Sequence, residues 1–312
     1  MNNQHFDRFS GPWVKCLLLF SLLYWLWFGL VVGIDAMAIA FYLLCVGLFF
    51  STSMTRKLGV CFTPLFIYLI CYSSLKILHD YNPFPIHNKG LYDMEVKLFG
   101  VKLDGLKVSL CEFFNQHVNL LSDIIAGSFY ITWAPFPILF GLWAFYKKRR
   151  KLVFNFWLAF LTINIFGFII YIVLPAAPPW YYLKYGAEII QDLGGEAAGL
   201  ARFDQLIGFG LYEGMYSQGT NTFGALPSMH AAFPMVLSYY SFRYKNKIFS
   251  SIFLISMVSI WFGAIYSNHH YLIDVLMGMS CAIIGIFLTD LLVNGKFAPK
   301  WYTKTIDYVS TP

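Results

Sequence analysis

Long apolar runs separated by short basic clusters place the strongest constraint on how this chain can fold. Of its 312 residues, 58% are hydrophobic and only 12% carry a charge, whereas soluble domains carry about 25% charged residues. Several of the runs approach or exceed the ~20 residues that a helix needs to cross a bilayer. The composition therefore excludes a soluble globule and predicts an all-α integral membrane protein, a polytopic helix bundle.

Hydropathy predicts a single membrane domain over 1–312, without a soluble appendage. The first apolar run is too long for a signal peptide and is followed by a second one, so 1–58 is expected to form an N-terminal anchor hairpin. About eight spans are predicted, at 13–33, 36–52, 59–77, 127–146, 153–174, 228–243, 249–266 and 271–293.

Basic residues indicate how these spans are oriented. With eight spans, the basic clusters all fall on one side of the membrane, which the positive-inside rule makes cytoplasmic. Because the clusters are short and lie between apolar runs, the net charge of +6 favours membrane orientation over binding of nucleic acid. The clusters are Arg8 with Lys15, Arg56 with Lys57, 147–151, 243–247 and 296–304.

Two polar segments separate groups of spans. The segment 78–126 mixes apolar and charged residues, which fits an interfacial segment of helices lying on the membrane surface, or equally a solvated connector with some helix. The segment 175–227 is predicted to be an extracytoplasmic substrate loop. It begins with prolines that end the fifth span, followed by aromatic residues suited to the membrane interface.

The substrate loop is acidic and contains only two basic residues, Lys184 and Arg202. Arg202 is predicted either to pair with Asp204 or to bind a phosphate group. The cysteines show no metal-ligand spacing, and five of the six lie inside apolar runs, so neither a metal site nor a disulfide framework is predicted.

Two histidines and a carboxylate are the notable ionisable groups at the span ends. His230 closes the stretch Phe223-Gly-Ala-Leu-Pro-Ser-Met-His230, and His270 opens His270-Tyr-Leu-Ile-Asp274. On a helix, Asp274 shares a face with His270 and can hold its imidazole through one nitrogen. The predicted topology puts both histidines at extracytoplasmic span ends, where two facing imidazoles would fit one phosphate. Each histidine alone could be a satisfied polar residue between helices, but the group of three favours a functional site.

These residues resemble known motifs. Pro227-Ser-Met-His230 and His270-x-x-x-Asp274 resemble the second and third motifs of the type 2 phosphatidic acid phosphatase superfamily. Further stretches resemble the fungal-type inositol phosphorylceramide synthases more closely: Ala177-Pro-Pro-Trp-Tyr181, Gly199-Leu-Ala-Arg202, Phe223-Gly-Ala-Leu-Pro-Ser228 and the doubled His269-His270. The resemblance is sharp over 172–276. It implies a six-helix phosphatidic-acid-phosphatase-like core, with catalytic helices over 228–293.

Two departures from the superfamily pattern favour the synthase branch. The phosphatases usually carry a Ser-Arg pair before the second histidine, where this chain has Gly263 and Ala264, and their first motif has no counterpart. The cations that would hold a phosphate are therefore left open, with Arg202 first, then Lys184 and Lys76. Backbone donors at the helix start near Ser228 would add to the phosphate site.

The resemblance implies a mechanism without a metal or other cofactor. His270 would be the nucleophile that forms a phosphohistidine, and Asp274 would orient it. His230 would protonate the leaving alkoxide and then deprotonate the incoming alcohol. His269 is equally well explained as a donor to the lipid headgroup or as an interfacial residue.

Three classes of function remain at this point. The first is a transferase that moves phosphoinositol from phosphatidylinositol to a ceramide-type lipid, or a synthase for another phospho-headgroup. The second is a lipid phosphate phosphatase. The third is a transporter or a structural membrane protein with incidental histidines, which the clustering of polar groups at one face disfavours. The expected partners are lipid substrates in the bilayer, with no obligatory protein partner. The expected location is the extracytoplasmic face of a bacterial inner membrane, or the Golgi in a eukaryote.

Overall fold

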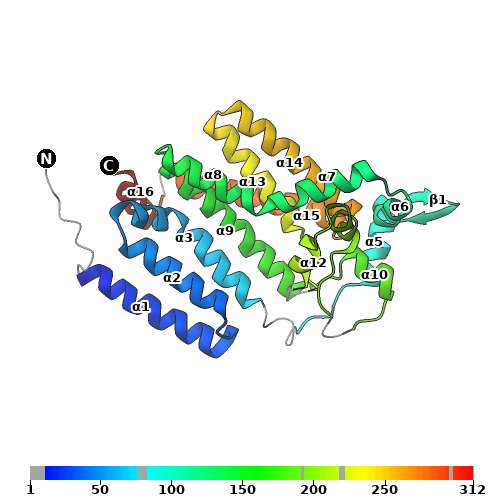
Figure 1. Ribbon diagram of the computed structural model, residues 1–312, viewed down its shortest axis with the longest axis horizontal. Helices are drawn as coiled ribbons and strands as arrows, with labels where there is room; N and C mark the ends of the chain where they lie inside the picture. The colour runs from blue at the N-terminus through cyan, green and yellow to red at the C-terminus, as the bar shows by residue number, and fades with distance from the viewer. Residues whose placement is uncertain are drawn as a thin grey trace.

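The computed structural model describes residues 11–75, 77, 83–190, 193–217, 222–294 and 298–311. This part of the chain is helical except for one two-stranded hairpin and the connecting loops (Figure 1). The longer helices are α1 (Gly11–Trp27), continued by the π-helical turn η1 (Phe28–Val32), α2 (Ala36–Phe50), α3 (Ser53–Ser74), α7 (Leu120–Tyr130), α8 (Pro135–Tyr146), α9 (Arg150–Val173), α13 (Met229–Tyr244), α14 (Lys247–Tyr266) and α15 (Leu272–Asn294). The shorter helices are α5 (Lys89–Phe99), α6 (Leu110–Gln116), η2 (Ile131–Trp133), α10 (Pro179–Tyr185), η3 (Ala198–Leu200), α11 (Ala201–Ile207), α12 (Leu211–Tyr216) and α16 (Lys300–Ser310).

Five of the described helices are long and apolar enough to cross a membrane, or six if a bent pair counts as one span. The bent pair joins Leu120–Trp133 to Pro135–Tyr146 at an angle of 49°. Two further predicted spans are helical but shorter, since α2 has 15 residues and α13 has 16. The predicted spans are therefore helical, whereas the lengths support five or six membrane crossings in the described chain rather than eight.

Helix α3 begins earlier than the span predicted at 59–77. Thr52 and Thr55 form a capping box in which each side-chain oxygen accepts the other residue's backbone N–H at 3.0 Å. This cap satisfies amide groups that the start of a helix otherwise leaves unpaired. As a result Arg56 and Lys57, predicted to lie in a loop, are buried in the first turns of α3.

Helix α9 lies in the centre of the bundle and packs against α3, α13 and α15. Glycines allow α15 to approach its neighbours closely. A Cβ at Gly285 would lie 2.3 Å from Ile163 Cγ2 of α9, and a Cβ at Gly278 would lie 2.0 Å from the Ser228 carbonyl oxygen. Small residues serve this purpose in membrane helices because little hydrophobic force draws helices together in lipid. Gly278 thus brings the start of α15 against the start of α13.

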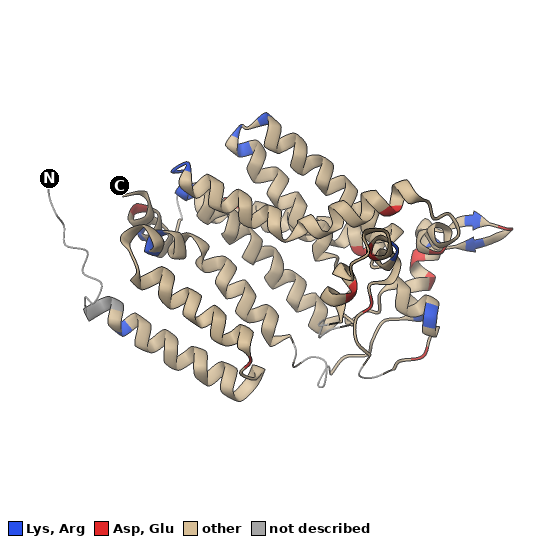
Figure 2. Ribbon diagram, in the orientation of Figure 1, with Lys and Arg blue, Asp and Glu red and all other residues tan. Residues whose placement is uncertain are grey.

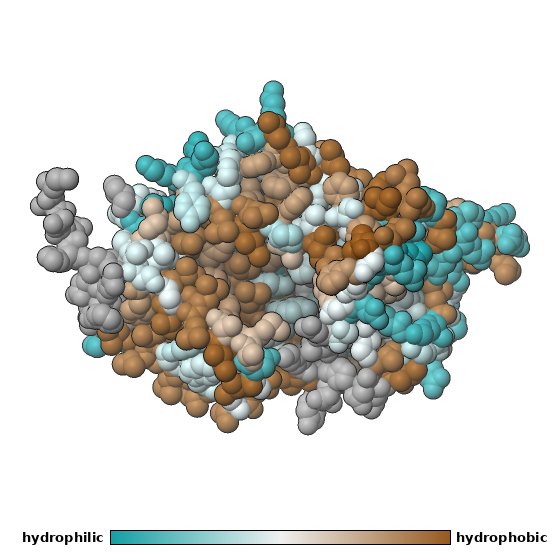
Figure 3. All heavy atoms as spheres, in the orientation of Figure 1, coloured by the Kyte–Doolittle hydropathy of each residue, from teal (hydrophilic) through white to brown (hydrophobic). Residues whose placement is uncertain are grey.

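Apolar side chains cover much of the molecular surface, including the N-terminal helices (Figure 3). Leu18, Leu22 and Leu43 in α1 and α2 are each more than half exposed, as expected for side chains that face lipid. The two helices contact one another through Tyr24, whose hydroxyl donates to the Ala38 carbonyl oxygen at 2.8 Å.

The segment between α3 and α7 contains a hairpin that was not predicted. Strands β1 (Val101–Leu103) and β2 (Leu106–Val108) pair antiparallel between α5 and α6. Asp104 and Gly105 form the turn with positive φ angles of 49° and 83°, and Asp-Gly is among the strongest hairpin sequences. The all-α prediction therefore holds for the fold, which carries this one short hairpin in addition.

Basic side chains cluster at one end of the long helices, and most acidic side chains lie toward the other end, together with further basic residues in the hairpin and loops (Figure 2). Basic residues gather at the connections between α8 and α9 and between α13 and α14. The histidine motifs lie at the other ends of α13 and α14. This separation supplies the charge asymmetry on which an orientation in the membrane depends.

Candidate active site

Backbone hydrogen bonds hold the motif segments together. The Ser228 N–H donates to the Asp274 carbonyl oxygen at 2.9 Å, which joins the start of α13 to the first turn of α15. The proline-rich segment after α9 adds to this frame, because the Ala225 N–H donates to Ala176 O at 3.2 Å and the Ala176 N–H to Phe223 O at 2.7 Å. Segments far apart in sequence therefore form one frame around the histidines.

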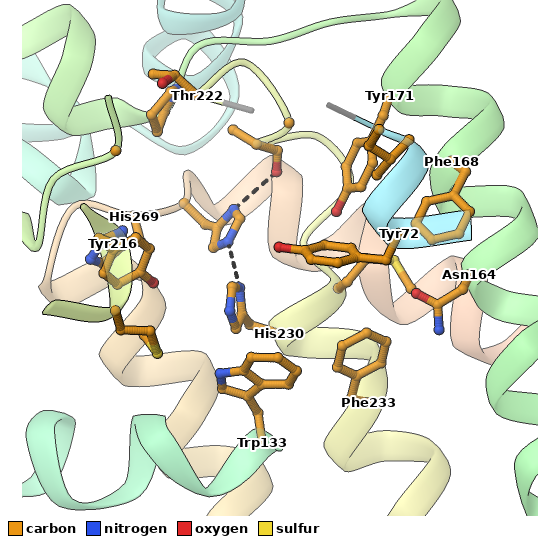
Figure 4. Close-up of a pocket in the computed structure, with 18 of the residues that line it drawn as sticks. Tyr72, Trp133, Asn164, Phe168, Tyr171, Tyr216, Thr222, His230, Phe233 and His269 are labelled. Atoms are coloured by element: carbon orange, nitrogen blue, oxygen red, sulfur yellow. Dashed lines mark hydrogen bonds between the residues drawn. The ribbon is translucent and has the colours of Figure 1, made fainter. Parts of the chain in front are cut away.

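The frame brings the two predicted histidines into direct contact. His230 Nδ1 lies 3.2 Å from His270 Nε2, and His270 Nδ1 lies 2.9 Å from the Ala225 carbonyl oxygen, as the dashed lines in Figure 4 mark. A carbonyl oxygen only accepts, so His270 Nδ1 carries a hydrogen. In the neutral ring Nε2 then has a free lone pair, which accepts a hydrogen bond from His230 Nδ1.

Asp274 is close to His270 but does not hold it as predicted. Its Oδ2 lies 3.7 Å from His270 Nδ1, beyond hydrogen-bonding distance, and instead accepts the Tyr271 N–H at 2.9 Å. The Ala225 carbonyl takes the position predicted for the carboxylate. Asp274 is fully buried, and its Oδ1 has no hydrogen-bond partner in the described part of the chain. It therefore lies beside His270 without a hydrogen bond to its ring.

The connection between α14 and α15 keeps its two histidines uncharged. Burial lowers the pKa of His270 to about 4 and the pKa of His269 to about 3, and the neighbouring His270 contributes to the second shift. Desolvation disfavours the charged imidazolium, which explains both directions. At neutral pH the His270 Nε2 lone pair is therefore free of a proton, as a nucleophile requires.

Aromatic rings fix the orientation of the histidines. Tyr130 stacks on His230 with ring centroids 4.9 Å apart, and Trp133 meets the same imidazole edge-on at 5.2 Å. Tyr216 stacks on His269 at 4.4 Å. Sequence reasoning missed these aromatic residues because one residue in five of the chain is aromatic, so their positions carry no distinguishing pattern.

A cavity of about 220 Å³ lies beside the two imidazoles (Figure 4). All three motif histidines line it, and no lysine or arginine does so among the described residues. Most of the other lining side chains are aromatic or apolar, which suits a ligand with one polar end. They include Tyr68, Tyr72, Trp133, Phe168, Tyr171, Trp180, Met215, Tyr216, Met229 and Phe233.

The predicted phosphate-binding cations do not line this cavity. Arg202 Nε donates to Asp123 Oδ1 at 2.7 Å, and the guanidinium lies over the Tyr266 ring at 5.0 Å. The alternative pairing of Arg202 with Asp204 is wrong, because Asp204 accepts backbone N–H groups at the start of α12.

The other residues predicted to bind the substrate differ in whether they line the cavity. Lys184 pairs at 2.5 Å with Glu196, which does line it. His269 lines the cavity and contacts the Ala197 carbonyl oxygen at 3.1 Å. Ser228 is fully buried at the start of α13. Lys76 lies outside the described residues.

Glu95 is a further residue that sequence reasoning missed. It is fully buried, and its two carboxylate oxygens accept the backbone N–H groups of Leu272 and Ile273, each at 3.1 Å. Burial raises the pKa of this carboxyl group, while the two amide contacts oppose the shift. Glu95 thus fastens α5 to the start of α15, directly beside the histidine motif.

Comparison with known proteins agrees with this geometry. Residues 105–288, which contain both histidine motifs, match the PAP2 superfamily. The chain belongs to the PAP2 superfamily. This member is 44% identical over 239 residues to the phosphoinositol dihydroceramide synthase of Bacteroides thetaiotaomicron, which covers 76% of this chain and 78% of that protein.

More distant relatives of this PAP2 member are fungal. It is 30% identical to the inositol phosphorylceramide synthase catalytic subunit of Saccharomyces cerevisiae, over 69% of this chain and 52% of that protein. It is 31% identical to the corresponding subunit of Schizosaccharomyces pombe, over 69% of this chain and 50% of that protein. It therefore spans about half of the fungal proteins. No solved structure matches. The resemblance read from the motifs is confirmed, and this PAP2 member is an enzyme.

Proposed function

We propose that this PAP2 enzyme transfers phosphoinositol from phosphatidylinositol to a ceramide-type lipid and releases diacylglycerol. The imidazole pair carries the proposal: an unprotonated His270 Nε2 and a His230 nitrogen face one another at 3.2 Å beside a cavity with largely aromatic walls. The relative named phosphoinositol dihydroceramide synthase supports the choice of headgroup and acceptor.

The reaction proceeds in two steps. His270 Nε2 attacks phosphorus, the bond from phosphorus to the diacylglycerol oxygen breaks, and protonated His230 gives its proton to the departing alkoxide. The primary hydroxyl of the acceptor then loses its proton to His230, and its oxygen attacks the phosphohistidine. The phosphorus–nitrogen bond breaks, and His270 returns to its starting form.

The surroundings of His270 support both steps. The Ala225 carbonyl holds the hydrogen on Nδ1 and so directs Nε2 toward phosphorus. The buried Asp274 lies 3.7 Å away and stabilises the positive charge that the ring acquires on phosphorylation. The phosphate itself is held by backbone donors near Ser228 and by His269. A role for Arg202 requires its pair with Asp123 to open.

The site faces the extracytoplasmic leaflet. In this proposal the eight crossings are the five long helices, the bent pair of α7 and α8 taken as one span, and the shorter helices α2 and α13, of which α13 is largely buried within the bundle. The basic ends of α9 and α14 lie in the cytoplasm, and the histidines lie at the opposite ends of α13 and α14. Both lipids reach the site laterally through the bilayer.

The test is a product analysis with purified protein in mixed micelles. Phosphatidylinositol labelled in the inositol is incubated with and without dihydroceramide, and the labelled products are separated. We expect a new labelled phosphoinositol lipid, distinct from the phosphatidylinositol substrate, only when dihydroceramide is present. The His270→Ala variant should form no such product. If labelled inositol phosphate forms at the same rate with and without dihydroceramide, the enzyme is a hydrolase and the proposal fails.

The phosphohistidine has a separate test. Wild-type protein quenched during turnover without acceptor should carry an acid-labile phosphoinositol adduct on His270 by mass spectrometry. An adduct on His230, or efficient turnover by His270→Ala, would assign the nucleophile differently.

A further inference from the structure

Asn164 places a polar group in the apolar wall of the catalytic cavity. It lies in the middle of α9, is 1% exposed and lines the cavity together with the histidines. Its Nδ2 donates to the Phe160 carbonyl oxygen of the same helix at 2.7 Å. The nitrogen must face this carbonyl because a carbonyl oxygen only accepts. The side-chain oxygen of Asn164 therefore points away from the helix backbone and into the cavity (Figure 4).

Among the described residues the Asn164 side chain makes one hydrogen bond, through its nitrogen, and none is found to its oxygen. Of the neighbouring side chains that Figure 4 labels, Phe168 and Phe233 have no donor, and the Tyr72 hydroxyl lies on the side of its ring away from Asn164. A buried amide oxygen without a donor is costly, and polar groups at membrane depth usually mark the path of a substrate. The position therefore requires a hydrogen-bond donor from a ligand or from water.

Asn164 lies about one helical turn deeper than the catalytic histidines. A Cβ at Gly167 would lie 2.7 Å from Met229 Sδ, so Gly167 packs against the side chain of the residue beside His230. Asn164 precedes Gly167 by three residues, which is about 4.5 Å along the helix. A group on the acceptor that meets Asn164 is therefore only a few bonds from the hydroxyl that reacts at His270.

We propose that the side-chain oxygen of Asn164 selects the acceptor lipid by accepting a hydrogen bond from its amide N–H or its secondary hydroxyl. This inference rests on the proposed function. In a ceramide the amide is attached to the carbon next to the one that bears the reacting hydroxyl, and the secondary hydroxyl is on the carbon beyond it. In a diacylglycerol the corresponding groups are esters, which have acceptors only. Asn164 thus favours a ceramide-type alcohol over a glycerolipid alcohol of similar shape.

The test uses two variants and a matched control. Asn164→Leu keeps the size of the side chain but removes the acceptor. Asn164→Ser bonds back to the Phe160 carbonyl in the helix, so it removes the cavity-facing amide oxygen and keeps a side-chain bond to that carbonyl. Asn155→Leu is the control, because Asn155 lies on the same helix outside this cavity, where its Oδ1 accepts the Tyr302 hydroxyl at 3.0 Å.

Each protein is assayed for kcat/KM with dihydroceramide, with its N-methyl analogue and with its 3-deoxy analogue. Release of inositol phosphate from labelled phosphatidylinositol without acceptor is measured in parallel. We expect kcat/KM for dihydroceramide to fall about 10-fold in both Asn164 variants, the scale of one buried hydrogen bond. Acceptor-free release and the control variant should stay within about twofold of wild type. In wild type, kcat/KM should be lower for the analogue that lacks the recognised donor than for dihydroceramide. In the Asn164 variants, removing this donor from the acceptor should cause no further fall in kcat/KM.

Each failure has its own pattern. If wild type uses dihydroceramide and the Asn164 variants discriminate among the three acceptors as wild type does, the role of Asn164 is wrong. An equal loss of acceptor-free release and of transfer would assign Asn164 to folding or to the chemical step, which also overturns the inference. If wild type transfers to none of the three acceptors, the proposed function fails and the inference falls with it.

Discussion

His270 depends on a backbone carbonyl for its tautomer, and this sets the expected role of Asp274. In serine proteases, replacing the orienting aspartate by asparagine costs about 10⁴-fold in kcat because the tautomer changes. Here the Ala225 carbonyl keeps the hydrogen on Nδ1 at 2.9 Å, while Asp274 contributes charge from 3.7 Å. We expect Asp274→Asn to lower kcat by about 10²-fold, the scale of one preorganised electrostatic partner.

The transfer assay with labelled phosphatidylinositol measures this loss. The matched control is Asp290→Asn, which alters a carboxylate at the other end of the same helix. Asp290 pairs with Arg243 at 2.7 Å at the basic end of the bundle. Unchanged activity of Asp274→Asn would remove the carboxylate from the mechanism, and a 10⁴-fold loss would mean that it controls the tautomer after all.

Acid should inactivate the enzyme only well below neutrality. The pKa of His270 is lowered by burial to about 4, so the folded protein keeps this imidazole neutral as the pH falls through the ordinary histidine range. Protonation below about pH 4 removes the Nε2 lone pair and with it the nucleophile. We expect kcat/KM for phosphatidylinositol to be limited by this group only near pH 4. An initial-rate profile from pH 3.5 to 8 in one detergent tests this, and an acid limb near pH 6.5 would indicate a solvated imidazole.

At this scale the sequence predicted which side chains come together but not what holds them. The sequence singled out His230, His270 and Asp274 because ionisable groups at apolar helix ends are rare enough to stand out. The structure brings the three side chains together. The hydrogen-bond acceptor for His270 Nδ1 is the main-chain carbonyl of Ala225. Every residue has such a carbonyl, so no side-chain pattern in the sequence marks this position. Likewise Arg202 pairs with Asp123, 79 residues away, a contact that only the packing of α11 on α7 creates.

Helix α5 controls the start of α15 through a single buried carboxylate. Glu95 accepts the first amide groups of α15, which would otherwise lack partners. We expect Glu95→Ala to destabilise the protein by about 1–3 kcal/mol for each amide left unsatisfied and to lower kcat because the turn that carries His270 and Asp274 shifts. Thermal melting in detergent and the transfer assay measure the two effects.

A neighbouring carboxylate on the same helix provides the control. Asp93 pairs with Lys89 at 2.6 Å, but its side chain is 54% exposed, and exposed pairs contribute little. Asp93→Ala should therefore leave both melting and kcat near wild type. If Glu95→Ala behaves like Asp93→Ala, the carboxylate is dispensable for the position of α15.

The elements that the sequence predicted well are those governed by length and hydropathy alone. The long apolar runs became helices, although α3 starts at a capping box formed by two ordinary threonines. The hairpin at 101–108 was missed because strands of three residues are too short to show an alternating pattern. Its turn, Asp104-Gly105, was nevertheless readable from the sequence.

The whole molecule has a polarity that predicts its orientation. The connections that precede α9 and α14 are basic. The loop that carries α10 to α12 lies at the opposite end of the bundle, with the histidines. In a background without native cysteines, Ser217→Cys should react with an impermeant thiol reagent in intact cells. Lys247→Cys should react only after permeabilisation. Both positions are exposed.

The labelling pattern also checks the number of crossings. Among the residues described between 217 and 247, α13 is the only helix before α14 begins, so opposite sides mean that this 16-residue helix spans the membrane. Labelling of both cysteines on the same side would mean that α13 does not cross. The reverse pattern would place the histidines at the cytoplasmic face. Reaction of both after permeabilisation is the control for accessibility.

The contact between His230 and His270 also determines what the enzyme does at rest. In this structure the lone pair that is proposed to attack phosphorus is engaged by the hydrogen of its partner ring, 3.2 Å away. A phosphodiester must separate the two rings before either can act, so the same event exposes the attacking atom and the proton carrier. In the proposed mechanism the imidazole pair therefore becomes reactive only when a phosphate group lies between the two rings.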